Sequence, residues 1–371
     1  MRAVPGNVND GHAYPCQREV LTAVTSPIGC AVIGYGPKHN FGWAHSAWID
    51  ATPDLRLVAV CDADPSRTEV AQNDFPHIRT YNRVEDVWAD PEIELVSLVT
   101  PHFTHCPLAV EAFAAGKHVV VEKAMCLNVA EATAMIEAGQ RAGKTLAVHH
   151  NRRHDGNFRR VKDVVQSGLI GDVFHVELTA GGYGPFRHGW YSEKDKSGGG
   201  FYYWGPHAVD WVLDLIPGRM TGVTGFFHKL VWHEMTNEDQ VRAIMRFENG
   251  AVADVTWSHI AAIGKPLWRI LGTKGGLLDT GAGGNVGYQE MIHGPSAGSL
   301  TVVTVDDTGH HEEQWPYFES DWDQYWQDLA DHLLRGGPVP VSGEAGRRTI
   351  AVLDAAEKSS ASGHTEPVPY E

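Results

Sequence analysis

The sequence has no hydrophobic run long enough to cross a membrane. A transmembrane helix needs about 20 consecutive apolar residues, and every apolar run in this chain is much shorter. Residues 1–24 also lack the apolar core of a secretory signal peptide. We therefore expect a cytoplasmic protein with no membrane partner.

Cysteine is scarce, and its spacing follows no known framework. The five cysteines form no Cys-x-x-Cys pair, which favours reduced thiols over disulfides. Metal motifs are missing as well, with no cysteine cluster and no His-x-x-x-His on a predicted helix. His149, His150 and His154 are close in sequence, but neighbouring strand residues point to opposite faces. We expect no metal site.

Positive charge is in the minority. The chain has 30 Lys and Arg against 46 Asp and Glu, a formal net charge of −16, which disfavours nucleic acid as a partner. A hydrophobic content of 43% and a charged content of 20% indicate a folded globular protein. A length of 371 residues is enough for two domains.

Residues 28–62 form a strand–turn–helix–strand pattern. One apolar run ends in the turn that holds Gly34 and Gly36, and a second apolar run ends at Asp62. This order is typical of a dinucleotide-binding unit, in which the glycines allow a tight turn and close approach to a pyrophosphate at a helix N-terminus. Five residues separate Gly36 from Gly42, where the usual fingerprint has two. An ordinary strand-to-helix turn is the alternative, which the flanking strands and Asp62 disfavour.

Asp62 also indicates which dinucleotide binds. It lies twenty residues beyond Gly42, about where a carboxylate meets the adenosine ribose hydroxyls. Its charge would repel a 2′-phosphate, and the next two residues, Ala63 and Asp64, offer no cation. Arg67 is a candidate cofactor residue, but it lies on the next predicted helix and is expected to face solvent. We predict NAD as the cofactor, rather than NADP.

The remaining pattern predicts two architectures in series. Up to His150, buried strands alternate with helices, as a doubly wound parallel sheet requires. The strands are predicted at 28–34, 56–62, 95–99, 118–122 and 145–149, and the helices at 42–52, 65–75, 104–115 and 128–142.

Beyond His150, consecutive strand patterns without intervening helices indicate a mainly antiparallel sheet packed on helices. Strands are predicted at 173–179, 222–228, 240–247, 251–258 and 268–272, and helices at 156–166, 207–216, 320–335 and 344–361.

The fold class is therefore α/β, with an N-terminal arm at 1–27, a Rossmann domain at 28–150 and a second α/β domain at 151–371. The second domain would carry a large open sheet. Residues 251–257 alternate between apolar and polar, and the outer face of such a sheet needs a cover. We expect a homo-oligomer, either a dimer or a tetramer.

Several segments carry a resemblance to a known family. HVVVEKA at 118–124 resembles the HVxxEKP segment of the Gfo/Idh/MocA oxidoreductases. The other segments that agree in order and spacing are VTPHFTH at 99–105, NRRHDGNF to VVQSGLIGDV at 151–173, SGGGFYYWGPHAVDW at 197–211 and AVLDAAEKSSASG at 351–363. The resemblance covers residues 28–363 and implies a Rossmann domain followed by an α/β domain with an open antiparallel sheet. It also implies reversible hydride transfer between NAD(P) and a secondary alcohol of a sugar, polyol or related compound.

Lys123 follows a buried strand, so its ammonium should emerge at the carboxyl edge of the sheet, where ligands of such folds bind. The alternative is a surface lysine that extends from a strand end to solvent. The resemblance places Lys123 on the active-site lysine of the family, where it would hydrogen-bond the reacting hydroxyl. Ala124 stands where the family motif has proline, so the backbone constraint of a proline is missing or is met otherwise.

His207 follows Gly205-Pro206 and is expected to begin a helix. The positive end of the helix dipole would then lower its pKa and favour the neutral, basic form. A histidine packed at a domain junction is the alternative. The resemblance implies that His207 is the general base of an Asp-x-x-x-His pattern. Tyr203 replaces the aspartate of that pattern, and we expect Tyr203 to contact the substrate.

The resemblance also implies a wider set of binding residues. Those expected to bind cofactor are Gly34, Gly36, Gly42, Asp62, Arg67, Thr100, Pro101, His105, Glu122 and Lys123. Those expected to contact substrate are Arg153, His154, Arg187, His188, Trp190 and Tyr203. Aromatic faces with interleaved polar groups suit sugar rings, although loop aromatics can also pack beneath their own loop.

The sequence thus predicts an NAD-dependent dehydrogenase that acts on a secondary hydroxyl of a sugar, glycoside or cyclic polyol. One alternative is a glycoside-cleaving enzyme that oxidises its substrate transiently, eliminates the activated group and then reduces the product. A non-catalytic NAD-binding protein is another, which the presence of both Lys123 and His207 disfavours.

Overall fold

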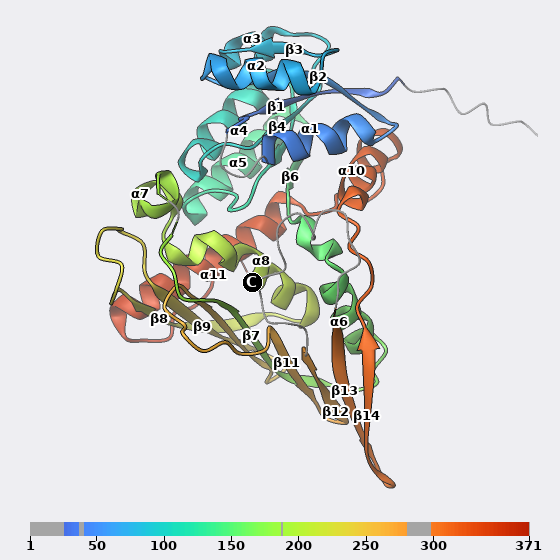
Figure 1. Ribbon diagram of the computed structural model, residues 1–371, viewed down its shortest axis with the longest axis vertical. Helices are drawn as coiled ribbons and strands as arrows, with labels where there is room; N and C mark the ends of the chain where they lie inside the picture. Colours follow the sequence, from blue (N-terminus) through green and yellow to red (C-terminus); the bar gives the residue numbers. More distant parts are fainter. Residues whose placement is uncertain (1–25, 37–40, 187, 280–297, 371) are drawn as a thin grey trace, which may run out of the picture.

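The computed structural model describes residues 26–36, 41–186, 188–279 and 298–370. Nearly all of the predicted N-terminal arm, and also Arg187, lie outside these residues. Two sheets organise the chain, with helices α8 and α11 between them (Figure 1). Within the described part of the chain, no helix has both the length and the hydropathy needed to span a membrane.

The first sheet is entirely parallel, as predicted, and has six strands, one more than predicted. Its strand order is β3 (Arg79–Tyr81), β2 (Leu55–Cys61), β1 (Ile28–Ile33), β4 (Leu95–Leu98), β5 (His118–Val121) and β6 (Leu146–Val148). The helices of this part are α1 (Phe41–Ala51), α2 (Pro65–Asp74), α3 (Val84–Ala89), α4 (His105–Ala114) and α5 (Val129–Ala142), with the short 3-10 helix η1 (His102–Thr104). This is the strand order of a Rossmann sheet, in which the order of the strands along the chain reverses between β1 and β4.

The sequence reading did not predict β3 and α3. β3 has three residues, none of them buried, at the edge of the sheet. It therefore lacks the apolar run by which a buried strand is recognised. The other strands and helices of this sheet begin and end within two residues of their predicted bounds.

The second sheet is eight-stranded and mixed. Its order is β14 (Gly309–Pro316), β13 (Ser299–Asp306), β12 (Gly275–Asp279), β11 (Trp268–Gly272), β7 (Val173–Gly181), β10 (Val252–Ser258), β9 (Gln240–Phe247) and β8 (Met220–His228). β7 and β10 pair in parallel, and the other neighbours pair antiparallel. The remaining helices are η2 (Asn151–His154), α6 (Gly156–Gln166), η3 (Trp190–Ser192), α7 (Lys194–Ser197), α8 (Gly200–Leu215), α10 (Asp323–Arg335) and α11 (Gly343–Ser362).

Strand β10 shows how the two faces of this sheet differ. Its apolar residues Ala253 and Val255 are buried, on the side where α8 packs against the strand. On the other face Asp254 forms an ion pair with Arg242 of β9. Ala253 and Val255 are thus covered by the chain's own helices, whereas Val252 shares the other face with Asp254. The homo-oligomer stays a prediction.

Helix α8 begins seven residues earlier than predicted, at Gly200 rather than His207. Gly205 and Pro206 suggested a helix break, yet both lie inside the helix and are buried. Phe201 and Tyr202 are also buried, and the Tyr202 hydroxyl donates to the Leu127 carbonyl at 2.9 Å. Tertiary packing of these aromatic residues outweighs the local cost of proline and glycine.

The turn after β1 has two tightly packed glycines. Gly34 has φ of +100°, and a Cβ there would lie 2.3 Å from the Val99 carbonyl oxygen. A Cβ at Gly42 would lie 2.4 Å from the Gly34 carbonyl oxygen and 2.8 Å from the Tyr35 Cα. Gly42 therefore allows close contact between α1 and the turn, the role of the third fingerprint glycine, despite its unusual spacing. Gly36 differs, because no atom of the described residues lies within 4 Å of its Cβ position.

We predict that Gly42→Ala destabilises the protein, whereas Gly36→Ala does not. The atoms that crowd Gly42 belong to the backbone and cannot rotate away, so overpacking should cost about 1–3 kcal/mol. The measurement is the thermal unfolding midpoint of the cofactor-free protein, with Gly36→Ala as the matched control. Equal midpoints for the two variants would contradict the close packing of α1 on the turn.

Candidate functional site

Asp62 lies beside the glycine turn, as predicted. Its Oδ2 accepts the Tyr35 N–H at 2.7 Å, and its Oδ1 accepts the Asp64 N–H at 2.9 Å. These two bonds fix the carboxylate beside the turn and leave lone pairs for further donors. The space at Gly36 and the N-terminal end of α1 adjoin the same turn. The arrangement fits a dinucleotide, with its pyrophosphate at the turn and its adenosine ribose at Asp62.

Arg67 does not simply face solvent, which corrects the sequence prediction. Its Nε donates to the Tyr35 carbonyl at 2.8 Å, and its guanidinium lies 5.9 Å from the centre of the Tyr35 ring. The side chain is half-buried. α2 begins directly after Asp64, which caps it by accepting the Ser66 N–H. Arg67 therefore lies in the first turn of α2 and can reach back to the glycine turn.

A buried carboxylate, Glu122, lies at the end of β5. Its Oε1 accepts the Nδ1–H of His149 at 2.6 Å and the Nε2–H of His45 at 3.1 Å. The Ser97 hydroxyl in turn donates to His45 Nδ1 at 2.8 Å. Burial lowers the pKa of His45 to about 4, so this ring is neutral. Burial alone would raise the pKa of Glu122, but the two histidine hydrogen bonds outweigh it and hold that pKa well below the usual range.

His45, Glu122 and His149 form the one group in the described part of the chain whose ligand atoms could approach a metal together. Ligands around a tetrahedral ion at 2.0–2.1 Å lie roughly 3.3 Å from one another. The 2.6 Å separation of Glu122 and His149 is shorter than that and fits a hydrogen bond. We therefore interpret this group as a hydrogen-bonded cluster that fixes Glu122. The sequence reading missed the cluster, because its residues are far apart in the chain.

Lys123 extends from the parallel sheet to α8, in the part of the chain that follows His150. Its Nζ donates to the Tyr203 carbonyl at 3.1 Å and lies 5.8 Å from the centre of the Tyr203 ring. The backbone N–H of Lys123 donates to Glu122 Oε2 at 3.0 Å. Burial lowers the pKa of the ammonium, and the negative charge of Glu122 opposes that shift.

Ala124, which replaces the proline of the family motif, is held by a residue that the sequence reading missed. The Lys123–Ala124 peptide bond is cis, and the Ala124 N–H donates to His102 Nε2 at 3.1 Å. His102 Nδ1–H donates to the Ser197 carbonyl at 2.7 Å. Burial lowers the pKa of His102 to about 3, so the ring is neutral and can do both. The segment after Lys123 is thus held by an N–H donor that proline would not have.

Thr100 and Pro101 lie in the loop after β4, and His105 begins α4, in the segment where the family pattern places cofactor residues. His105 is fully buried, with Nε2 at 2.8 Å from the Thr100 carbonyl and Nδ1 at 2.9 Å from the Ala124 carbonyl. The Thr104 hydroxyl donates to the Pro101 carbonyl at 2.7 Å. His105 therefore ties the loop after β4 to the segment that follows Lys123.

His207 lies within α8, so the predicted reason for its low pKa is wrong. The pKa is indeed lowered well below its usual value, first by burial and then by the positive charges of Lys123 and Arg152. A dipole at a helix start is not the cause, because α8 begins two turns earlier. The His207 ring is 3% exposed, and its Nδ1 has no hydrogen-bond partner among the described residues.

Arg153 is committed to an ion pair with Asp210 of α8. Its Nε and Nη2 donate to the two carboxylate oxygens at 2.8 and 2.7 Å. Asp210 is buried, and this pairing is expected to orient η2 against α8. His154 is half-buried, and burial lowers its pKa. The structure thus pairs Arg153 with α8, and it shows no side-chain hydrogen bond of His154 among the described residues.

Aromatic rings surround Tyr203. The ring centres of Trp257, Phe186 and His259 lie 5.7, 5.8 and 6.0 Å from that of Tyr203, and the Tyr191 ring lies 6.4 Å away.

Trp190 stacks on Tyr191 at 3.8 Å and meets the His102 ring edge-on at 4.8 Å, so it packs at the site. His188 is exposed, and Arg187 lies outside the described residues.

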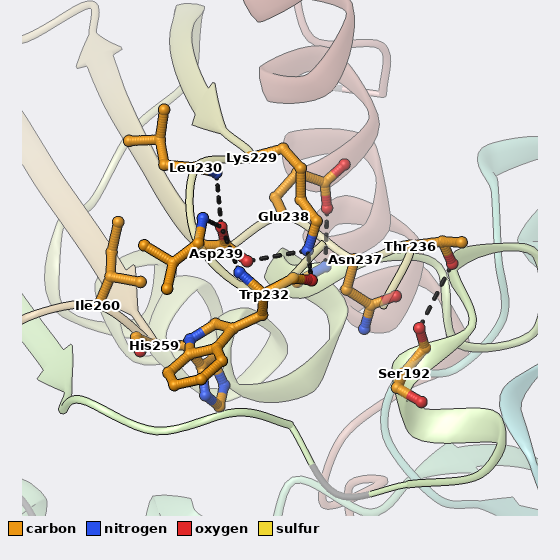
Figure 2. A network of polar contacts seen from close by, with 12 residues as sticks. Ser192, Lys229, Leu230, Trp232, Thr236, Asn237, Glu238, Asp239, His259 and Ile260 are labelled. Carbon is orange, nitrogen blue, oxygen red and sulfur yellow. Dashed lines mark hydrogen bonds and ion pairs between the residues drawn. The ribbon is translucent and has the colours of Figure 1, made fainter. Parts of the chain in front are cut away.

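The loop between β8 and β9 forms a network of polar contacts (Figure 2) and bonds to two residues of this aromatic group. The Trp232 indole N–H donates to the His259 carbonyl at 3.1 Å, and the Asn237 amide donates to the Tyr191 carbonyl at 2.6 Å. The loop itself is fixed by Asp239, which is fully buried and accepts the backbone N–H groups of Leu230 and Val231, both at 2.6 Å. The sequence reading assigned no role to this loop, since its residues show no recognisable motif.

Comparison with known proteins agrees with both halves of the structure. Residues 28–150 match a family model described as "Oxidoreductase family, NAD-binding Rossmann fold", and residues 158–278 match one described as "GFO/IDH/MocA C-terminal domain". The chain is 25% identical over 345 residues to scyllo-inositol 2-dehydrogenase (NADP(+)) of Bacillus subtilis, covering 90% of this chain and 94% of the relative. It is 26% identical over 337 residues to myo-inositol 2-dehydrogenase of Thermotoga maritima, covering 88% and 95%.

A solved structure of the oxidoreductase yvaA from Bacillus subtilis has the same fold. The TM-score is 0.84 at 23% identity, and the match covers 92% of this chain and 99% of that one. The family models match the Rossmann part and the part that begins the second sheet. The chain therefore belongs to the Gfo/Idh/MocA oxidoreductase family and carries an NAD(P)-binding Rossmann domain.

Proposed function

We propose that this protein is an NAD-dependent dehydrogenase that oxidises a secondary hydroxyl of a neutral sugar, glycoside or cyclic polyol. The observation that carries the proposal is the contact between Lys123 and α8, the helix that also holds His207. Lys123 comes from the carboxyl edge of the parallel sheet and bonds to Tyr203 of α8, and its charge acts on His207 of the same helix. A cation and a neutral imidazole at this edge are suited to act on an alcohol.

His207 would act as the general base. Because burial lowers its pKa, the ring is neutral and can take the hydroxyl proton. The Lys123 ammonium would donate to the same oxygen and stabilise its developing negative charge. NAD, when bound, accepts the hydride with its two electrons, and the carbon–oxygen bond becomes a carbonyl. The residues that would hold NAD are those of the glycine turn and Asp62, and the proton remains on His207.

The charges at the site favour a neutral substrate. Arg153 is already paired bidentately with Asp210, so its guanidinium is not available to a substrate carboxylate. The aromatic rings around Tyr203 offer apolar faces, which suit the C–H faces of a sugar or cyclitol. The relatives named as inositol dehydrogenases support this class.

The first test is a screen of neutral sugars, glycosides and inositols for NADH formation by absorbance. A dehydrogenase forms NADH in proportion to oxidised product. Product formed without net NADH would instead support the glycoside-cleaving alternative, in which the cofactor is reduced and reoxidised within one turnover. No turnover across the whole panel would support the non-catalytic alternative.

We predict that NAD binds at least tenfold more tightly than NADP, a difference of about 1.4 kcal/mol. The fixed Asp62 carboxylate would accept ribose hydroxyls and repel a 2′-phosphate. Asp62→Ser should narrow the difference, because it leaves Arg67 beside the turn without the opposing carboxylate. Isothermal titration of both nucleotides measures this, with Asp86→Ser on α3 as a surface control. Equal affinities in the unaltered protein would refute the NAD preference.

We predict that Lys123→Ala and His207→Ala each lower kcat by about 10²- to 10⁴-fold, the usual range for general acid–base catalysis. NAD binding should persist in both. The losses should not multiply in the double variant, because residues that act as a unit are non-additive. In the unaltered enzyme kcat should hold down to pH values well below 6.5, since His207 stays neutral there. Near-normal turnover of His207→Ala would overturn the assignment.

We predict that Tyr203→Phe is nearly silent and that Tyr203→Ala raises KM. Lys123 contacts the backbone carbonyl of Tyr203, so both variants retain that bond. Phenylalanine also keeps the ring within the aromatic group. A fall in kcat in Tyr203→Phe with unchanged KM would show instead that the hydroxyl takes part in proton transfer.

A further inference from the structure

His207 has a buried nitrogen without a partner. The ring is 3% exposed, and Nδ1 is enclosed with no hydrogen-bond partner among the described residues. A base that uses Nε2 must carry its own proton on Nδ1. That proton needs an acceptor, because buried polar groups in native proteins are nearly always satisfied. Tyr203, where the family pattern has an aspartate, brings no carboxylate to this helix face.

A second histidine lies next to this nitrogen. His150, just beyond β6, is 2% exposed, and its ring meets that of His207 edge to face with centres 5.6 Å apart. Its Nδ1 is likewise buried without a partner among the described residues. The two buried rings are therefore neighbours, and a hydrogen bond, made directly or through one bridging water, is the usual way to satisfy the nitrogens of such a pair.

Asp210 favours one tautomer of His150. Its Oδ2 lies 3.9 Å from His150 Nδ1, so its charge favours a proton on that nitrogen of His150. His150 then has Nε2 free as an acceptor. Asp210 is itself fixed by the bidentate pair with Arg153. The order of groups is therefore Asp210, His150 and then His207.

We propose that His150, supported by Asp210, is the positioning residue of His207. It accepts the His207 Nδ1–H, which holds the base in the tautomer whose Nε2 lone pair serves the substrate hydroxyl. It does for His207 what an orienting group does for the histidine of a catalytic triad. When His207 takes the substrate proton, the resulting positive charge is shared toward Asp210. The inference rests on the proposed function, since it assigns a supporting role within the same site.

Other charged groups face the pair and fit this role. The positive charges of Lys123 and Arg152 disfavour protonation of His207. Those of Arg153 and Lys123 do the same for His150. The negative charge of Glu122 favours protonation of both rings. The cations oppose a second proton on either ring. The pair therefore rests with one proton on each ring, which is the state that orientation of a neutral base requires.

The test compares two variants of His150. His150→Gln keeps a carbonyl oxygen that can accept the His207 Nδ1–H, whereas His150→Phe keeps the ring shape and accepts nothing. We expect kcat to fall about 100-fold in His150→Phe and less than tenfold in His150→Gln, with KM and NAD affinity unchanged in both. The control is His118→Gln, which replaces a half-buried ring acceptor at the end of β5 away from Glu122. Equal losses in the Gln and Phe variants would overturn the proposal.

Two further measurements keep the proposal falsifiable if the Phe variant does not fold. In a His207→Ala background, His150→Gln should have no additional effect on kcat, and an additive loss would contradict action through His207. Nitrogen NMR of histidine-labelled, substrate-free protein should show His207 protonated on Nδ1 and not on Nε2. The opposite tautomer would refute the positioning role. Because this last measurement needs no substrate, it separates failure of this inference from failure of the proposed dehydrogenase activity.

Discussion

The carboxyl edge of the parallel sheet depends on one buried carboxylate. Glu122 accepts hydrogen bonds from His45 of α1 and His149 of the segment after β6, and from the backbone of Lys123. It therefore ties together three elements that meet at this edge. A buried negative charge is costly unless it is fully hydrogen-bonded, and here each oxygen has a donor. The same charge offsets the cost of burying the adjacent Lys123 ammonium.

Histidines lie beside two positions where the chain differs from the family pattern. His102 accepts the backbone N–H of Ala124, where the motif has proline. His150 lies beside His207, on whose helix Tyr203 stands where the family pattern has an aspartate. A buried neutral imidazole can donate from one nitrogen and accept at the other. That dual capacity lets one residue link the Ala124 backbone to Ser197 across the two parts of the chain.

The part of the chain after His150 contributes aromatic surface to the site more than unpaired charge. Arg153 forms an ion pair with Asp210 of α8, and the loops of this part bring aromatic rings to Tyr203. The loop between β8 and β9 fixes those rings through a buried aspartate that bonds backbone N–H groups. Such a site suits a ligand with apolar faces, and in the proposed function the chemistry is left to Lys123 and His207.

The sequence by itself determined the parallel sheet, because buried strands and capped helices leave local patterns. It also indicated Gly34, Gly42 and Asp62, whose roles depend on residues within the same unit. It misplaced the start of α8, because Gly205 and Pro206 read locally as a break, and tertiary packing of Phe201 and Tyr202 outweighs that. Tertiary structure alone decided that Glu122 bonds to His45 and His149 and that Arg153 bonds to Asp210. It also decided that the His150 ring lies against that of His207. Each of these contacts joins residues tens of positions apart, and it depends on side-chain distances that no local pattern encodes.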